Sequence, residues 1–405
     1  MLQSVRLSRF TNTDSPLLNS KEPRLSVGKL LTDSSMSATI GAIPITFDVQ
    51  HNFLDAEPIT SEAYNKQLDE QFSREVTLKE VNAAMREAIT DRNQVLVVYA
   101  PDKPEVKIPS DAELEKMVLD AQKKTYPAYV EKRLDENLIP VLPKKGRVVS
   151  EKPALHGMTE LTLSNGVKVY FKKTDYQKDA VVMNFFGEGG SSLYPDKDVL
   201  NTKFISTAVK EGGVGRFSST ELNKVLSDKT VRINAGVGIE TQSISGSSSL
   251  KDVRTLFELT YLYFTHLRRD DQAFNAELNR MRSFLTNREA SPNVSYNDSI
   301  ASIVYGNSPR VQPVKASSID KVSYDRVLQI YKERFSNASN FKMIIMGNIE
   351  LSQLQPLLEQ YIASLPATGK KESFVKSYPD VRNCNETHRF EKQMKTPLAR
   401  VSIFY

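Results

Sequence analysis

The sequence predicts an α+β fold built from duplicated domains, and three observations support this prediction. The first is a β-hairpin at residues 160–171, in which apolar and polar residues alternate on both sides of Asn165-Gly166. The second is a helix, a strand and a further helix between Tyr324 and Pro366. The third is an internal repeat, because residues 76–91 align without a gap on residues 322–337. In both copies a helical pattern precedes an apolar strand pattern, so we predict one complete domain and part of another.

Composition excludes several classes of protein. The chain has 405 residues and a net charge of +5, and its 54 basic and 49 acidic residues form no basic block, so we expect no nucleic-acid partner. The single cysteine, Cys384, cannot form an intramolecular disulfide or a thiolate metal cluster, and its polar surroundings give little support for a nucleophile. No run of about 18 apolar residues predicts a membrane span, and the N-terminus shows no secretory signal.

The first part of the chain predicts helices and little else. Residues 1–48 are rich in Ser, Thr and Leu without periodicity, and we expect poor order there. Helices are predicted at 61–72 and, with Thr77 as N-cap, at 77–89, where a buried stripe is expected to contain Val81, Met85, Ala88 and Ile89. Residues 95–99 form a continuous apolar run that predicts a strand, and a helix follows at 111–124. The charged, Pro-containing residues from Tyr126 to Pro153 predict an interdomain linker.

The complete domain, residues 157–366, opens with the hairpin, for which Asn165-Gly166 predicts a type I′ turn. A strand at 180–186 leads into the Gly-rich residues 187–192, which lack the sequence of a phosphate loop and therefore predict a tight turn. The pattern then predicts helices at 200–209 and 219–226, the latter capped by Ser218 or Ser219, one or two strands at 231–247, and helices at 252–266 and 271–287. Residues 367–383 predict a second linker, and 384–405 open a new strand pattern.

Several of these segments resemble the pitrilysin/insulinase family of zinc peptidases, above all its long bacterial branch of four homologous domains. They are the hairpin 161–171, residues 185–195, 249–264, Tyr305-Gly306-Asn307 before Pro309, and 331–366. The resemblance runs from about residue 50 to residue 405. It implies pitrilysin-like α/β sandwich domains: the tail of a second domain at 49–110, an interhalf linker at 111–156, a complete non-catalytic third domain at 157–366, a linker at 367–383, and the start of a fourth domain, truncated, at 384–405. Residues 1–48 do not resemble the family.

The resemblance also indicates where a metal site would lie. In this family an H-x-x-E-H motif on one helix binds Zn²⁺, its Glu acts as general base, and a Glu on a later helix completes the ligands. Alignment of the third domain places this motif over residues 204–208, so that Phe204 and Ala208 occupy the ligand positions and Thr207 the position of the base. Phe284 falls near the third ligand position. We therefore predict no metal ligands and no catalytic residues in this chain, with zinc confined to the full-length family enzyme.

Other candidate residues give no alternative chemistry. The four histidines, His51, His156, His266 and His388, lie more than about a hundred residues apart, so no local ligand pair exists. A Gly-x-Ser-x-Gly nucleophile motif is absent. We expect the four histidines to have surface or loop roles.

Two functions follow as hypotheses. In the first, the chain is a fragment of a zinc-dependent peptidase, contains the non-catalytic half that encloses a peptide substrate, and is inactive alone. In the second, it is a separate binding or assembly subunit whose partner is an independently encoded catalytic half. Members of this branch are often exported to the bacterial envelope, although this N-terminus carries no visible signal peptide.

Overall fold

The computed structural model describes residues 43–88, 94–100, 106–125, 127, 137–383, 385–392 and 398–404. It divides into two units, one of Met1–Asp135 with Ser227–Lys229 and one of Glu136–Leu226 with Thr230–Tyr405. The second unit contains the sheet, and the first contributes helices in the residues that the structure describes. The domain boundaries inferred from the family resemblance remain predictions.

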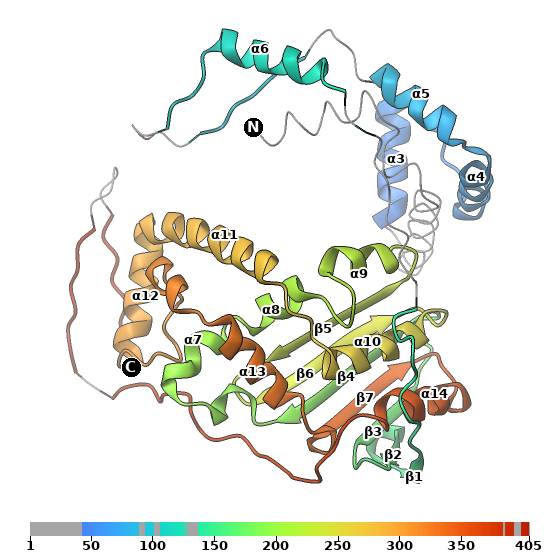
Figure 1. Cartoon of the computed structure of the whole chain (residues 1–405), viewed down its shortest axis with the longest axis vertical. Coiled ribbons are helices and arrows are strands. Elements are labelled where there is room, and N and C mark those ends of the chain that lie inside the picture. Colours follow the sequence, from blue (N-terminus) through green and yellow to red (C-terminus); the bar gives the residue numbers. More distant parts are fainter. Residues whose placement is uncertain are drawn as a thin grey trace. The chain divides into compact units, whose positions relative to one another are not determined.

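A seven-stranded mixed sheet organises the second unit (Figure 1). Its spatial order is β1-β2-β3-β7-β4-β6-β5, and every neighbouring pair is antiparallel except β3 and β7, which run parallel. The strands are β1 (Val148–Pro153), β2 (Thr159–Leu163), β3 (Lys168–Lys173), β4 (Val181–Glu188), β5 (Val231–Val237), β6 (Thr241–Ser248) and β7 (Phe341–Gly347). The central strand, β7, therefore comes last of the strands in the chain and lies between β3 and β4.

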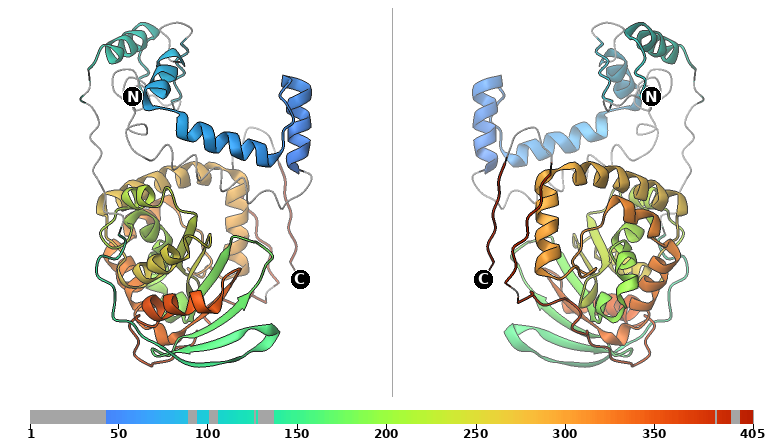
Figure 2. Two further views of the ribbon diagram at one scale, coloured as in Figure 1. Left: turned by 90° about the vertical axis from the view of Figure 1, so that its right-hand side faces the viewer. Right: turned by 90° about the vertical axis from the view of Figure 1, so that its left-hand side faces the viewer.

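Helices pack against the sheet and against one another. The helix α10 contacts β5 and β6, and α8 contacts β5, α11 and α13. The helices of this unit are α7 (Val199–Thr202), α8 (Ile205–Gly212), α9 (Ser219–Val225), α10 (Val253–Thr265), α11 (Asp271–Ala290), α12 (Pro292–Val304), α13 (Tyr324–Arg334) and α14 (Leu351–Leu357), which a π-helical turn, Leu358–Ile362, continues. In Figure 2, the hairpin of β2 and β3 lies along the outer margin of the unit, below α14.

The core lies between one face of the sheet and these helices. Alternate residues of β4 and β7 point into it, which is the period that a half-covered strand requires. Four phenylalanines from β4, α10, α13 and β7 form an aromatic cluster with ring centroids 4.8–5.9 Å apart: Phe185, Phe264, Phe335 and Phe341. Each fully buried side chain of this size contributes about 1.5–3 kcal/mol of hydrophobic free energy. This cluster is therefore a main source of stability.

Most predicted elements are present. The strands at 180–186 and 341–346, the two strands within 231–247, and the helices at 219–226, 252–266, 271–287 and 324–335 are confirmed within a few residues. Ser218 is the N-cap of α9, and its hydroxyl and the side chain of Glu221 form a capping box. Helices α4 (Glu62–Glu75), α5 (Leu78–Ala88) and α6 (Asp111–Gln122) also agree with the sequence. The α5 and α13 helices of the internal repeat have matching bounds, and Thr77 and Ser323 cap them.

The hairpin turn differs from the prediction. Type I′ needs positive φ at both central residues, but of the two only Gly166 has it, at 86°. The Gly166 N–H donates to the Leu163 carbonyl, and the Leu163 N–H donates to the Val167 carbonyl, each at 2.9 Å. This is a three-residue loop with Gly166 in the left-handed position. The Asn165 amide instead donates to the carbonyls of Ile362 and Leu365, at 2.7 and 3.2 Å, and so ties the turn to the end of the last helix.

Four further expectations are wrong, each for a physical reason. The helix predicted at 200–209 is divided into α7 and α8, because Phe204 leaves the helical conformation at φ −102°, ψ 5°. Residues 95–99 form no strand and are exposed, since an apolar run becomes a strand only where it finds a partner. The stripe on α5 is not buried: Val81 and Met85 are half-buried and Ala88 is exposed, while Ile89 lies outside the described residues. No strand occurs at 385–392 or 398–404.

Three elements were not predicted. Helix α3 (Ile43–Asp55) begins inside the segment 1–48, so the expectation of poor order is wrong for residues 43–48. The strand β1 lies within residues 111–156, which the sequence predicted as linker, and pairs with β2 at the sheet edge. Its side chains are almost all exposed, so it has no apolar alternation to reveal it. Helix α12 also has no buried residue, so its polar sequence lacks the apolar pattern from which a helix is predicted. Residues 1–42, most of the segment expected to be poorly ordered, lie outside the described residues.

Candidate functional site

The three aligned motif positions lie at and within α8, which packs on α11 as the resemblance implies for a helix pair that shares a metal. Phe204 precedes the first turn of α8 and is 1% exposed, and Ala208 is fully buried. Thr207 is half-buried between them. Phe284 on α11 is 65% exposed and points to no core. The apolar positions of α8 are therefore used for packing.

These residues do not fit a zinc ion. A phenyl ring and a methyl group supply no donor atom, and one hydroxyl is not the set of imidazole and carboxylate ligands that zinc needs. In the part of the chain that the structure describes, no group of three or more His, Cys, Asp or Glu side chains could hold a metal. The alignment of the motif onto residues 204–208 itself stays a prediction.

Each histidine has a separate setting. His51 is exposed in α3 (Ile43–Asp55), and His156 is exposed with a positive φ of 59°. His266 caps the end of α10 and lies 2.6 Å from the Thr265 hydroxyl through Nδ1. His388 contacts the Glu386 carboxylate through Nε2 at 2.9 Å. Cys384 lies outside the described residues.

The Gly-rich residues 187–192 form a turn whose amides are all used by the facing hairpin of β5 and β6. The N–H groups of Gly189, Ser191 and Ser192 each donate at 2.8 Å to the carbonyls of Glu240, Gly238 and Ile239. The Gly190 N–H donates to the side-chain oxygen of Gln242, also at 2.8 Å. A phosphate loop needs free amides, so this segment cannot cradle a phosphate.

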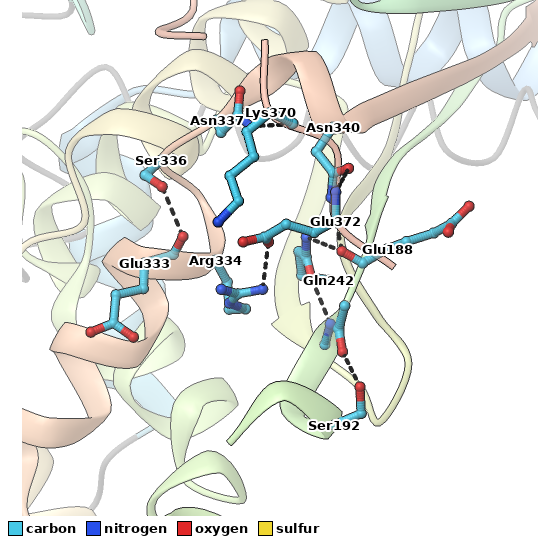
Figure 3. Close-up of polar contacts among 12 residues, drawn as sticks. Glu188, Ser192, Gln242, Glu333, Arg334, Ser336, Asn337, Asn340, Lys370 and Glu372 are labelled. Carbon is cyan, nitrogen blue, oxygen red and sulfur yellow. Dashed lines mark hydrogen bonds and ion pairs between the residues drawn. The ribbon is translucent and has the colours of Figure 1, made fainter. Parts of the chain in front are cut away.

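A polar cavity of about 230 Å³ lies where α13 and β7 meet the segment after Pro366, and sequence reasoning missed it (Figure 3). Arg334 is its best buried charge, with 9% of its surface exposed. Its guanidinium donates to the Glu372 carboxylate at 2.9 Å and to the Tyr194 hydroxyl at 3.1 Å. We call this cavity the Arg334 pocket.

Tyr194 joins the Arg334 pocket to a second ion pair. Its hydroxyl donates to Glu333 at 2.7 Å, and burial, followed by that bond, raises the pKa of Tyr194 to about 12. The guanidinium carbons of Arg326 and Arg334 lie 5.5 and 5.3 Å from its ring centroid, within cation–π range. The Arg326 guanidinium in turn donates two hydrogen bonds to the Asp198 carboxylate, at 3.1 and 2.7 Å. Tyr194 therefore stays neutral and links two arginines.

The same pocket fastens residues 368–375, part of the predicted linker. Asn337 accepts from the Thr368 N–H at 2.9 Å and donates to the Lys370 carbonyl at 2.7 Å. Asn340 accepts from the Glu372 N–H at 2.9 Å, as Figure 3 shows. Because its polar groups bind one another and this segment, the Arg334 pocket serves the structure rather than chemistry. Its residues are distant in sequence, and only the polar run 332–340 hinted at it.

The face of the sheet that points away from the core has exposed side chains on its central strands. On β4 the inward residues are buried, whereas Val182 and Asn184 are exposed and Phe186 is half-buried. On β7, Met346 is exposed and Ile344 half-buried. We call this surface the open sheet face. By the register of the strands, this face also contains Glu188 of β4 and Lys342 of β7 and, on the other strands, Ser150, Lys152, Glu160, Thr162, Lys168, Tyr170, Lys172, Arg232, Asn234, Gly236, Thr241, Ser243, Ser245 and Ser247.

Comparison with known proteins gives consistent results. Residues 321–405 match the family model described as the peptidase M16 inactive domain. The chain is 22% identical over 405 residues to a probable zinc protease PqqL of Haemophilus influenzae, and covers 100% of itself and 42% of that protein. It is 24% identical over 321 residues, 78% of the chain and 31% of the relative, to an Arabidopsis thaliana protein named zinc protease PQQL-like. The chain thus spans less than half the length of these relatives.

Solved structures support the fold. The periplasmic protease PqqL of Escherichia coli matches with a TM-score of 0.56 and 17% identity, covering 95% of this chain and 42% of that one. The ferredoxin protease FusC, an E83A mutant solved in complex with Arabidopsis ferredoxin, matches with a TM-score of 0.55 and 14% identity over 93% of this chain and 41% of that one. The predicted α+β, pitrilysin-like fold is confirmed. In the described residues, no helix is long and apolar enough to cross a membrane.

The resemblance predicted from the sequence is therefore confirmed: residues 321–405 match the inactive domain of the M16 peptidases, and the chain is homologous to the PqqL zinc proteases.

Proposed function

We propose that this chain is the non-catalytic half of a zinc-dependent peptidase and has no peptidase activity alone. The observation that carries the proposal is the packing of α8. Phe204 and Ala208 stand where the family motif would place its ligands, and both are buried in the core. Helix α8 packs against α11 and α13, contains no histidine and has Glu211 as its single carboxylate, which is not the ligand set that zinc needs.

The role proposed for this half is to enclose a peptide substrate. The open sheet face supports that role, because its apolar residues Val182 and Met346 are exposed and Phe186 and Ile344 only half-buried, whereas the inward residues of β4 and β7 are buried. Such a surface can form one wall of a chamber once a second half closes over it.

The partner we propose is a catalytic half of the same family that carries H-x-x-E-H. That half is either another part of the same polypeptide or a separately encoded subunit. In-frame coding sequence for the motif upstream of this chain favours the first arrangement, and a discrete neighbouring gene favours the second.

An assay of the purified 405-residue chain tests the proposal. Quenched fluorescent peptides of mixed sequence are incubated with the chain and added Zn²⁺, with and without a chelator. We expect no turnover above that of the buffer. Chelator-sensitive turnover that co-elutes with the chain would contradict the proposal. The variant Thr207→Ala shows whether such turnover depends on the only hydroxyl among the three motif positions.

A further inference from the structure

We propose that the open sheet face selects an extended peptide segment in which acidic side chains alternate with apolar ones. This inference rests on the proposed function, since it names the class of peptide that the same surface would hold. It is carried by two features of the face: an apolar centre and a surplus of basic residues on one side.

The apolar centre spans β4 and β7. Val182 and Met346 are direct neighbours in the register of these strands, and they are 48% and 42% exposed. Ile344 is the next residue after Met346 on this face of β7, and Phe186, which is paired with Lys342, lies diagonal to Ile344; both are half-buried. The side chains of a soluble sheet face usually alternate apolar-in and polar-out, so exposed apolar residues at its centre indicate a contact surface.

Basic residues flank this centre on β3 and β7. Lys168 lies directly opposite Lys342 in the parallel pair, and Lys172 lies opposite Met346. Two like charges placed opposite each other on neighbouring strands repel, a cost that an anionic partner removes. Counting β1 and β5, the face has five basic residues, Lys152, Lys168, Lys172, Lys342 and Arg232, against the two acids Glu160 and Glu188.

The two acids do not neutralise this surplus. Glu160 is shared by Lys152 and Lys168, at 3.4 and 3.1 Å. Glu188 lies 3.6 Å from Lys342. The Lys172 ammonium donates a hydrogen bond to the His156 carbonyl at 2.8 Å, and this neutral acceptor does not compensate its charge. A peptide carboxylate can therefore gain an ion pair here.

Beyond the apolar centre, the face has small hydroxyl side chains on β6 and one basic residue, Arg232 of β5, which lies opposite Ser247. Ser243, Ser245 and Ser247 follow one another on β6, opposite Phe186, Asn184 and Val182. Hydroxyl and amide groups of this kind accept and donate hydrogen bonds without a charge preference. Four of the five basic residues of the face thus lie on the side of β1, β3 and β7, and one lies on β5, which suits an extended segment that carries most of its carboxylates on one side.

Binding to the purified chain tests the inference, with a chelator present so that cleavage plays no part. Two fluorescein-labelled twelve-residue peptides, one alternating Asp with Leu and one alternating Lys with Leu, are compared by anisotropy. We expect the acidic peptide to bind at least about tenfold more tightly, and to weaken when salt rises from about 0.05 to 0.3 M, because exposed charges are screened.

Two double variants locate the surface. Lys172→Gln with Lys342→Gln should weaken binding of the acidic peptide by about tenfold. Lys251→Gln with Lys332→Gln removes the same charge from exposed positions beside α10 and on α13, and should change the affinity less than about twofold.

The outcomes separate the two proposals. Equal affinity for both peptides, or equal loss in both double variants, would overturn the acidic preference and leave the enclosing role intact. No binding of either peptide would overturn the enclosing role as well. Displacement of the acidic peptide by a single-stranded oligonucleotide would assign the lysines to nucleic acid instead. Peptide cleavage in the separate zinc assay would contradict only the lack of activity.

Discussion

Asp198 and Arg326 show how much one buried ion pair can contribute in this domain. Asp198 is 6% exposed and accepts two hydrogen bonds from the Arg326 guanidinium. These bonds hold the pKa of Asp198 below its ordinary value, mainly through hydrogen bonding and against the effect of burial. A bidentate charged pair in such a place connects the turn before α7 with α13.

We expect Asp198→Asn to lower the free energy of unfolding at pH 7 by about 1–3 kcal/mol, because it removes the charge that accepts two hydrogen bonds from the half-buried Arg326 guanidinium and leaves only Glu333, at 3.5 Å, as its counter-ion. Since the folded-state pKa is lowered, this stabilisation is complete above the unfolded pKa of about 3.9 and is lost as the pH falls through the folded value. The difference between variant and wild type should therefore shrink below about pH 4. Urea unfolding at pH 7 and at pH 3 measures it.

The control for this prediction is Asp325→Asn. Asp325 also pairs with an arginine, Arg269, but its side chain is 79% exposed. Solvent screens an exposed pair, so the control should change the free energy of unfolding much less than Asp198→Asn does. Equal stability of Asp198→Asn and wild type at pH 7 would refute the argument.

At the scale of elements, the turn after β4 depends on Gly190. Its φ of +55° disfavours other residues, and a Cβ atom there would lie 2.4 Å from the Ile239 carbonyl oxygen. Gly190→Ala should therefore cost more than the about 1–3 kcal/mol expected for backbone strain alone. Gly157→Ala is the matched control, since φ is +68° and nothing lies within 4 Å of the added atom. If urea unfolding shows similar losses in the free energy of unfolding for both variants, the structure relieves the clash in Gly190→Ala and the prediction is wrong.

Elements whose sequence carries their own packing pattern could be predicted. In β4 and β7, buried residues such as Met183 and Ile345 alternate with more exposed ones. Both strands are central, and this alternation allows the sequence alone to identify them. The edge strand β1 has almost no buried side chain and hence no pattern. The apolar run at 95–99 has the composition of a strand but no partner among the described residues. Pairing is a tertiary property, which composition cannot supply.

The candidate sites divide in the same way. The sequence alone could propose which residues replace the metal ligands, Phe204 and Ala208, because the family motif is local and spans five consecutive residues; this alignment stays a prediction. The Arg334 pocket could not, because Tyr194, Arg334 and Glu372 meet only after β7 enters the sheet between β3 and β4. The break at Phe204 was missed for a related reason: burial of its ring, rather than helix propensity, sets its backbone conformation.

At the scale of the whole molecule, the two units differ in what holds their elements. In the second unit, strands and helices share a core in which Phe185, Phe257 and Ile345 are fully buried. In the first unit, the described helices α4, α5 and α6 contain no buried residue. They have 14, 11 and 12 residues, lengths at which an isolated helix is marginal in water. Their stability rests on caps such as Ser61 and Thr77, which supply about 1 kcal/mol each.

Hydrogen exchange of the 405-residue chain should distinguish the packed elements of the second unit from the helices of the first unit. Amides of α4, α5 and α6 are expected to exchange by local opening, with protection far below that of β4, β7 and α10, whose amides need unfolding of the core. Peptides from α12, which also lacks buried residues but is tied by the ion pair of Arg288 and Asp298 at 3.0 Å, provide an internal comparison within the second unit. Exchange from α5 as slow as that from β4 would mean that the first unit has a core of its own. If α5 becomes protected only when a catalytic half is added, the helices of this unit are completed by that partner, as the proposed assembly requires.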